Sequence, residues 1–132
     1  MTDSLDPGAL LARYYPLTRG PKVCLRLVRP RDLEGIRELL RDHAPGADEL
    51  EPGRLVNFDL SRRLVLCATA LVDHRERVVG VGAIELDAAA GTDEVPRPGL
   101  LVVDRERTEG LEPLLHDALT GQAAAIGRAR AA

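Results

Sequence analysis

A short apolar run passes through a charged turn into an amphipathic helical pattern between residues 100 and 119. The run is Leu-Leu-Val-Val, the turn contains Gly110, and apolar residues recur at helical spacing from Leu111 onward. The first amides of a helix have no partner within the helix, and the helix dipole places partial positive charge at the same end. Because a diphosphate placed there would be stabilised, this segment is a candidate phosphate site.

The same residues also allow a purely structural interpretation. Thr108 and Gly110 are typical turn residues, and Pro113 suits the first turn of a helix, where its amide is not needed. Glu112 would stabilise an unliganded helix end by about 0.3–1 kcal/mol. The residue types alone leave both interpretations open.

Regular patterns elsewhere predict the elements that position this segment. Residues 23–28 alternate in hydropathy and predict a strand, and from Asp32 apolar residues recur at helical spacing until Pro45. Residues 64–72 and 78–86 are nearly all apolar or small, which is typical of buried strands. The polar stretch between them is short and therefore predicts an antiparallel hairpin.

The predicted order is strand, helix, strand, strand, strand, helix, which indicates an α+β fold with helices on the faces of a mostly antiparallel sheet. We expect one domain over residues 22–132. It is preceded by an amino-terminal segment, residues 1–21, with a short helix that ends by Pro16.

Two stretches predict loops, and one glycine predicts a helix end. Residues 45–62 and 87–99 are rich in Gly, Pro and acidic residues, and the first of them has at most a short helix near Asp59. Gly127 predicts the end of the final helix.

Over roughly residues 22–127, the sequence resembles the first two-thirds of a domain of the GNAT superfamily of N-acetyltransferases. The resemblance is carried by VCLRLVRPRDLEGIRELL, by RRLVLCATALVDHRERVVGVGAIEL and by the strand, loop and helix at 100–119. The central hairpin is most similar to GNAT domains of the bacterial protein-lysine acetyltransferase type. This resemblance implies a three-layer arrangement, with helices on the faces of a mostly antiparallel sheet that lacks the family's last strands.

The resemblance also implies acetyl-CoA as cofactor. Arg107 and Gly110 match the family's loop pattern Arg/Gln-x-x-Gly-x-Gly/Ala, and Glu112 occupies the third defined position. Arg107 would hold the loop or contact a phosphate. The backbone of the strand would pair with the pantetheine arm through Leu101 and Val103. The loop amides would hold the diphosphate, and they belong to Thr108, Glu109, Gly110, Leu111 and Glu112. The Glu112 carboxylate would oppose the diphosphate by about 1 kcal/mol or more.

Acetyl transfer to an amine needs a base for the amine proton. Many GNAT members place a glutamate at the start of the strand before the loop, where this chain has Pro98. Glu85, at the end of the preceding strand, is the nearest substitute and the candidate catalytic residue; the alternative interpretation is a solvated strand end. Glu94 and Asp104 are loop acids for which the sequence shows no partner.

Two functions follow from the resemblance. The first is an acetyl-CoA-dependent N-acetyltransferase that acts on an amine or a lysine. The second is a catalytically inactive GNAT-like interaction or regulatory module with an empty cofactor site, which would account for Glu112, Pro98 and the missing last strands together. The strand at 100–103 would form an open sheet edge, so we expect a homodimer or a partner protein to cover it.

Composition and charge argue against several other classes of protein. With 2% aromatic residues and a net charge of −3, the chain offers neither a stacking platform nor a basic stripe for nucleic acid. No run of about 18 apolar residues is present, so we expect a cytoplasmic protein without membrane contact. Cys24 and Cys67 lie in apolar runs and are expected to be reduced core residues. No metal site is expected, because His43, His74 and His116 lack metal-ligand spacing.

Overall fold

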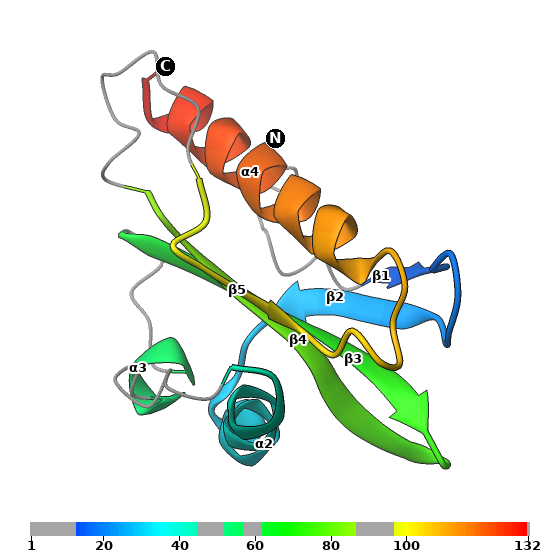
Figure 1. Ribbon diagram of the computed structural model, residues 1–132. Coiled ribbons are helices and arrows are strands. Elements are labelled where there is room, and N and C mark those ends of the chain that lie inside the picture. The colour runs from blue at the N-terminus through cyan, green and yellow to red at the C-terminus, as the bar shows by residue number, and fades with distance from the viewer. Residues whose placement is uncertain (1–12, 45–51, 57–61, 87–96, 132) are drawn as a thin grey trace.

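The structure, a computed structural model, describes residues 13–44, 52–56, 62–86 and 97–131 (Figure 1). Within these ranges five antiparallel strands form one open sheet in sequential order. The strands are β1 (Arg13–Tyr15), β2 (Val23–Leu27), β3 (Arg63–Val72), β4 (Arg75–Glu85) and β5 (Leu100–Val103). The helices are the 3₁₀ helix η2 (Pro30–Asp32), α2 (Leu33–His43), α3 (Pro52–Val56) and α4 (Leu111–Ala131). The predicted α+β class with a mostly antiparallel sheet is confirmed.

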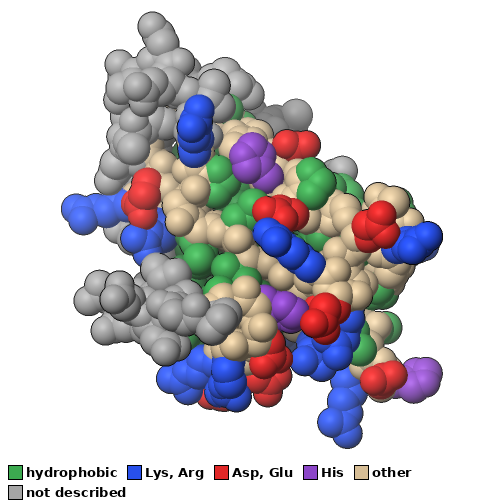
Figure 2. Space-filling model, in the orientation of Figure 1, with side chains coloured by type: hydrophobic (Ala, Val, Ile, Leu, Met, Phe, Trp, Pro, Cys, Tyr) green, Lys and Arg blue, Asp and Glu red, His purple; other side chains and the backbone are tan. Residues whose placement is uncertain are grey.

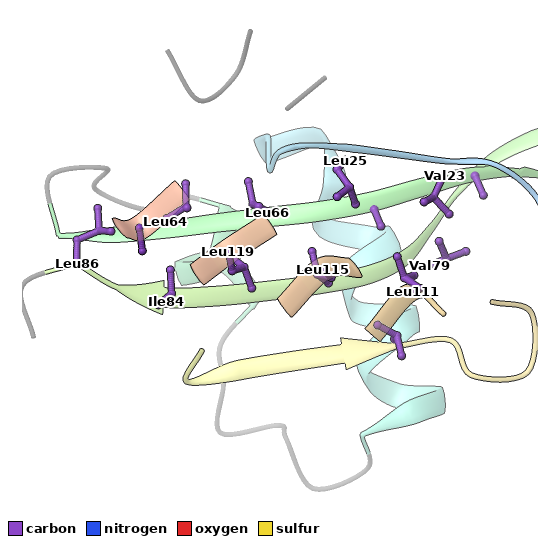
Figure 3. Packing of buried hydrophobic residues seen from close by; sticks show 14 residues of the cluster. Val23, Leu25, Leu64, Leu66, Val79, Ile84, Leu86, Leu111, Leu115 and Leu119 are labelled. Carbon is purple, nitrogen blue, oxygen red and sulfur yellow. The ribbon is translucent and has the colours of Figure 1, made fainter. Parts of the chain in front are cut away.

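Helices cover both faces of the sheet, with α4 across one face and α2 and α3 on the other (Figure 1). Successive side chains of a strand point to opposite faces, so β3 contributes to two cores. Leu64 and Leu66 belong to the core beneath α4 (Figure 3), and Val65 and Cys67 belong to the core beneath α2. Burial on both faces explains why the sequence of β3 is apolar without alternation.

Two glycines of β4 allow α4 to lie close to the sheet. A Cβ atom on Gly82 would overlap Cδ1 of Leu119, and one on Gly80 would lie 3.1 Å from Cδ2 of Leu111. Both leucines are fully buried on the α4 face (Figure 3). The Gly-Val-Gly segment of β4 is therefore a packing surface, which fixes the distance between α4 and the strands beneath it.

The β3–β4 hairpin is tighter than the sequence predicts. Asp73 and His74 form the turn with φ angles of 52° and 66°, and β4 already begins at Arg75. Two consecutive positive φ angles are typical of the two-residue turns that match the twist of a hairpin. Residues 75–77, which belong to the polar stretch that predicts the turn, are part of β4 instead. The two strands of the hairpin are therefore longer than expected.

The ends of the chain's elements also differ from expectation. Residues 13–15 form β1, which pairs with β2, so the predicted amino-terminal helix does not extend over these residues; its remaining positions lie outside the described residues. Helix α4 continues past Gly127. Helix α3 interrupts the predicted loop earlier than expected, whereas the position near Asp59 lies outside the described residues. In the described ranges, no helix is long and apolar enough to cross a membrane.

Candidate functional site

The outer edge of β5 is unpaired within the described part of the chain, because β5 is the last strand of the sheet. Its inner edge pairs with β4. Beyond the strand end, the amide of Asp104 donates to the carbonyl of Val79 at 2.8 Å. Since antiparallel pairing alternates along a strand, the amides and carbonyls of Leu101 and Val103 point to the open edge.

Asp104 organises the loop between β5 and α4. Its side chain is 2% exposed, and its carboxylate accepts hydrogen bonds from the Arg107 guanidinium at 2.8 Å and from the amides of Glu106 and Arg107 at 3.2 Å each. Its carbonyl accepts from the Thr108 amide at 3.0 Å. His43 Nε2, at the end of α2, lies 3.4 Å from Oδ1 of the same carboxylate. The expectation that Asp104 has no partner is therefore wrong.

The hydrogen bonds decide the charge state of Asp104. Burial alone would raise the pKa of this carboxyl, but the Arg107 side chain and amide outweigh burial, and the pKa is lower than the ordinary aspartate value. Asp104 also raises the pKa of Arg107. Of the two roles that the resemblance implies for Arg107, the geometry supports the one in which this side chain holds the loop.

The far end of the loop is held against the β1–β2 turn. The amides of Thr18 and Arg19 donate to the carbonyl of Glu109 at 3.0 and 3.4 Å, and the Glu109 amide donates to the carbonyl of Arg19 at 3.0 Å. Gly110 has a φ of 93°, and a Cβ atom there would lie 2.8 Å from Oγ1 of Thr18. The chain itself requires a glycine at this position, whether or not a ligand binds.

The start of α4 offers fewer amides than the resemblance implies. The amides of Thr108 and Glu109 donate within the chain, and Pro113 has no N–H. Leu111 and Glu112 form the beginning of α4, where amides have no partner within the helix. An anion at the start of α4 would therefore be held mainly by the amides of the first two helical residues and of the glycine before them.

Glu112 pairs with a cation at the start of α4. Its Oε2 lies 3.1 Å from Nη2 of Arg105, and the two side chains are 45% and 77% exposed. An exposed pair of this kind contributes about 0–1 kcal/mol, so either partner can be exchanged at little cost. Arg105 thus brings a positive charge to the start of α4 that the sequence pattern does not single out.

Glu85 lies at the other end of the β5 region. Its Oε1 accepts a hydrogen bond from Nε of Arg63 at 2.7 Å, and its side chain is half-exposed. Ala83 pairs with Leu100, so Glu85 is two residues beyond the start of β5. The candidate base and the loop amides therefore lie at opposite ends of the strand. Glu94 lies outside the described residues.

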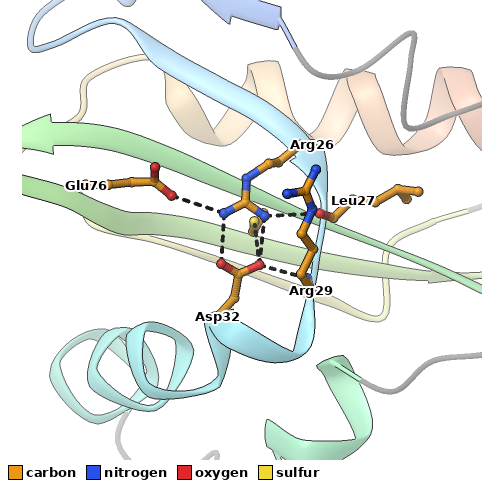
Figure 4. A network of polar contacts seen from close by, with 6 residues as sticks. Arg26, Leu27, Arg29, Asp32 and Glu76 are labelled. Atoms are coloured by element: carbon orange, nitrogen blue, oxygen red, sulfur yellow. Dashed lines mark hydrogen bonds and ion pairs between the residues drawn. The ribbon is translucent and has the colours of Figure 1, made fainter.

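A buried ion network that the sequence patterns do not predict joins β2 to η2 and β4 (Figure 4). Arg26 donates to both carboxylate oxygens of Asp32, at 2.7 and 2.8 Å, and to Glu76 at 3.2 Å. The pKa of Asp32 would be raised by burial, but it is lowered by Arg26 and by the Arg29 amide. The sequence does carry one signal of this network: Arg26 lies within a strand whose neighbouring strand is apolar. An arginine in such a place is tolerated only when an acidic partner is buried with it.

Both cysteines are free thiols. Cys67 is buried as predicted, and burial raises its pKa to about 12. Cys24 is only half-buried, and burial raises its pKa as well. Neither thiol is activated as a nucleophile, since the reactive form is the thiolate.

A cleft of about 430 Å³ lies between α2 and β4. Its lining carries both signs of charge, with Arg31 and Arg77 beside Glu38 and Glu76. On the face shown in Figure 2, basic and acidic side chains are likewise interspersed, and neither sign of charge gathers in one patch. The described residues include no group of three or more His, Cys, Asp or Glu side chains that could hold a metal ion.

Comparisons with protein-family models, with curated proteins and with solved structures find no match for this chain. The functional interpretation therefore depends on the geometry of the residues themselves. We use the name β5–α4 site for the open edge of β5, the loop at residues 104–110 and the start of α4.

Proposed function

We propose that the chain is a GNAT-type domain that binds acetyl-CoA at the β5–α4 site and transfers the acetyl group to an amine. The observation that carries this proposal is continuity: a strand edge that no other described strand covers runs directly into a braced loop and a helix start. A strand edge offers amides and carbonyls to an extended amide-containing ligand, and a helix start offers amides and a positive dipole to a diphosphate. Acetyl-CoA carries both groups in one molecule.

The proposal assigns different backbone groups to the two parts of the cofactor. The outward amides and carbonyls of Leu101 and Val103 would pair with the pantetheine arm. The amides of Gly110, Leu111 and Glu112 would receive the diphosphate. The thioester would then lie toward the start of β5, the end of the strand at which Glu85 lies.

Glu85 would act as the base in this arrangement. A neutral amine attacks the thioester carbonyl, and a C–N bond forms while the C–S bond breaks. The amine proton passes to the Glu85 carboxylate, directly or through water, and the departing thiolate takes up a proton from solvent. The half-exposed position of this side chain leaves it accessible to an amine.

Calorimetric titration with acetyl-CoA tests the binding step. A proline at position 101 removes the outward amide without removing a bond to β4, whereas an alanine removes only the side chain. We expect Leu101→Pro to bind acetyl-CoA about 3- to 10-fold more weakly than Leu101→Ala, as expected for a hydrogen bond of about 0.5–1.5 kcal/mol. Equal affinity of the two variants would contradict the assignment of this amide.

Glu112 offers a test at the diphosphate end. Glu112→Gln removes a negative charge beside the proposed diphosphate, so we expect about a fivefold gain in affinity, from about 1 kcal/mol of repulsion removed. Glu34→Gln is the matched control, because Glu34 is also an exposed glutamate paired with an arginine, on α2. A wild-type protein that shows no binding at millimolar acetyl-CoA would refute the proposed function.

A second candidate function is favoured by the charges at the start of α4. The chain places the carboxylate of Glu112 beside Arg105 and that of Glu109 beside Arg19, at 3.1 and 3.7 Å. The charges at the start of α4 are thus paired within the chain. Such pairing fits a catalytically inactive GNAT-like module that self-associates or docks on a partner protein through the open edge of β5.

The two candidates differ in measurable ways. The inactive module would show a dimer mass by light scattering, which Leu101→Pro reduces to a monomer mass, and it would show no heat of binding with acetyl-CoA. The transferase would release CoA thiol in the presence of amines, and Glu85→Gln would slow that release while leaving the affinity for acetyl-CoA within about twofold.

A further inference from the structure

We infer that Asp104 is a positioning residue of the acetyl-CoA loop, and that helix α2 is part of the site through His43. This inference rests on the proposed function, because it concerns how the loop of that site is held. Asp104 does not face the open edge: its side chain is 2% exposed and turned into the loop.

The carboxylate of Asp104 accepts hydrogen bonds from the two residues at the centre of the following turn, Glu106 and Arg107. One oxygen accepts from the amides of Glu106 and Arg107 and lies near His43, and the other accepts from the Arg107 guanidinium. The main chain of the same residue donates to Val79 of β4. A loop bound in this way can move only if several hydrogen bonds to one buried residue break together.

His43 extends this arrangement to the opposite layer of the fold. It is the last residue of α2, and its side chain is 15% exposed where it meets Asp104. A basic side chain at the carboxyl end of a helix is also favoured by the helix dipole. The loop is therefore held by β4, by α2 and, through Glu109, by the β1–β2 turn, three elements that are distant in sequence.

The consequence for binding is a division between inward and outward amides. The amides of Glu106, Arg107 and Thr108 are directed to Asp104 and are not offered to a ligand. The amides from Gly110 onward lead into α4, and the turn at Asp104 sets their orientation. Asp104 would therefore control cofactor affinity without touching the cofactor.

The experiment compares Asp104→Ala, Asp104→Asn and His43→Ala in the full chain. We expect Asp104→Ala to weaken acetyl-CoA binding at least tenfold and to raise the hydrogen-exchange rates of the amides at 106–108. Asparagine keeps one side-chain acceptor and should restore part of the affinity, and His43→Ala should weaken binding several-fold from the other face of the sheet. In a transfer assay the loss should appear as a higher Michaelis constant for acetyl-CoA, because positioning acts on binding.

Glu76→Gln is the control for a general loss of stability. Glu76 lies in the Arg26 network rather than at the loop, so its variant should change neither acetyl-CoA affinity nor exchange at 106–108. If the wild type binds acetyl-CoA and Asp104→Ala binds it equally well, the positioning role is wrong while the proposed function stands. If the wild type does not bind acetyl-CoA, the proposed function fails, and this inference fails with it.

Discussion

Replacing Asp32 by asparagine should destabilise the protein strongly, because the change leaves a buried guanidinium without its main counter-charge. Arg26 and Asp32 are 8% and 5% exposed and joined by two hydrogen bonds of 2.7 and 2.8 Å. Removing one partner of such a pair costs about 3–5 kcal/mol. Asparagine retains one acceptor and Glu76 still contacts Arg26, so we place Asp32→Asn near the lower end and Asp32→Ala near the upper end.

Urea unfolding at neutral pH measures this cost directly. The double variant Arg26→Met with Asp32→Asn should lose less free energy of unfolding than the sum of the single changes, because no unpaired buried charge remains. Glu34→Gln breaks an exposed ion pair and should stay within about 0.5 kcal/mol of the wild type. An Asp32→Asn protein as stable as Glu34→Gln, or strict additivity in the double variant, would show that Asp32 does not stabilise the buried Arg26 charge.

Three further predictions concern packing, thiol chemistry and pH. Gly82→Ala should lower the free energy of unfolding by about 1–3 kcal/mol, since its Cβ would overlap a leucine side chain of α4. Gly121→Ala, on the open side of α4, should raise the free energy of unfolding by about 0.5–1 kcal/mol. With a thiol reagent at pH 8, Cys24 should react before Cys67, whose pKa burial raises to about 12; simultaneous reaction in the folded protein would contradict this order. Because the pKa of Asp104 is lowered in the folded state, its stabilising contribution is present above the unfolded pKa and is lost as the pH falls through the folded pKa. Asp104→Asn should therefore flatten the acid limb of stability against pH, and an unchanged limb would argue against it.

Hydrophobic patterning predicts the elements that bury one or two continuous apolar faces. Alternation in β2, helical spacing in α2 and the apolar runs of β3 and β4 each correspond to a described element. The three-residue strand β1 is not predicted, because Arg-Tyr-Tyr carries no alternating apolar pattern and depends on pairing with β2. The sequence also predicts a longer hairpin turn than the two residues observed, Asp73 and His74. Charged residues can continue a strand where it projects beyond the rest of the sheet.

The site is only partly predictable for a different reason. Local sequence indicates the strand, the turn at Gly110 and the helix start, since these depend on neighbouring residues. Asp104 and Arg26 each have a local partner, Arg107 and Asp32, and also a distant one, His43 and Glu76, which only folding brings close. An arginine within a buried strand signals that a partner exists, but the sequence does not identify that partner, so the two networks emerge only from the tertiary structure.

Amide chemical-shift mapping of the wild-type protein during titration with acetyl-CoA shows directly whether the β5–α4 site holds this cofactor. We expect saturable shifts at the outward amides of β5 and at the amides that begin α4. These residues are Leu101, Val103, Gly110, Leu111 and Glu112. No saturable shift at millimolar acetyl-CoA, or shifts confined to the cleft between α2 and β4, would contradict the proposed site.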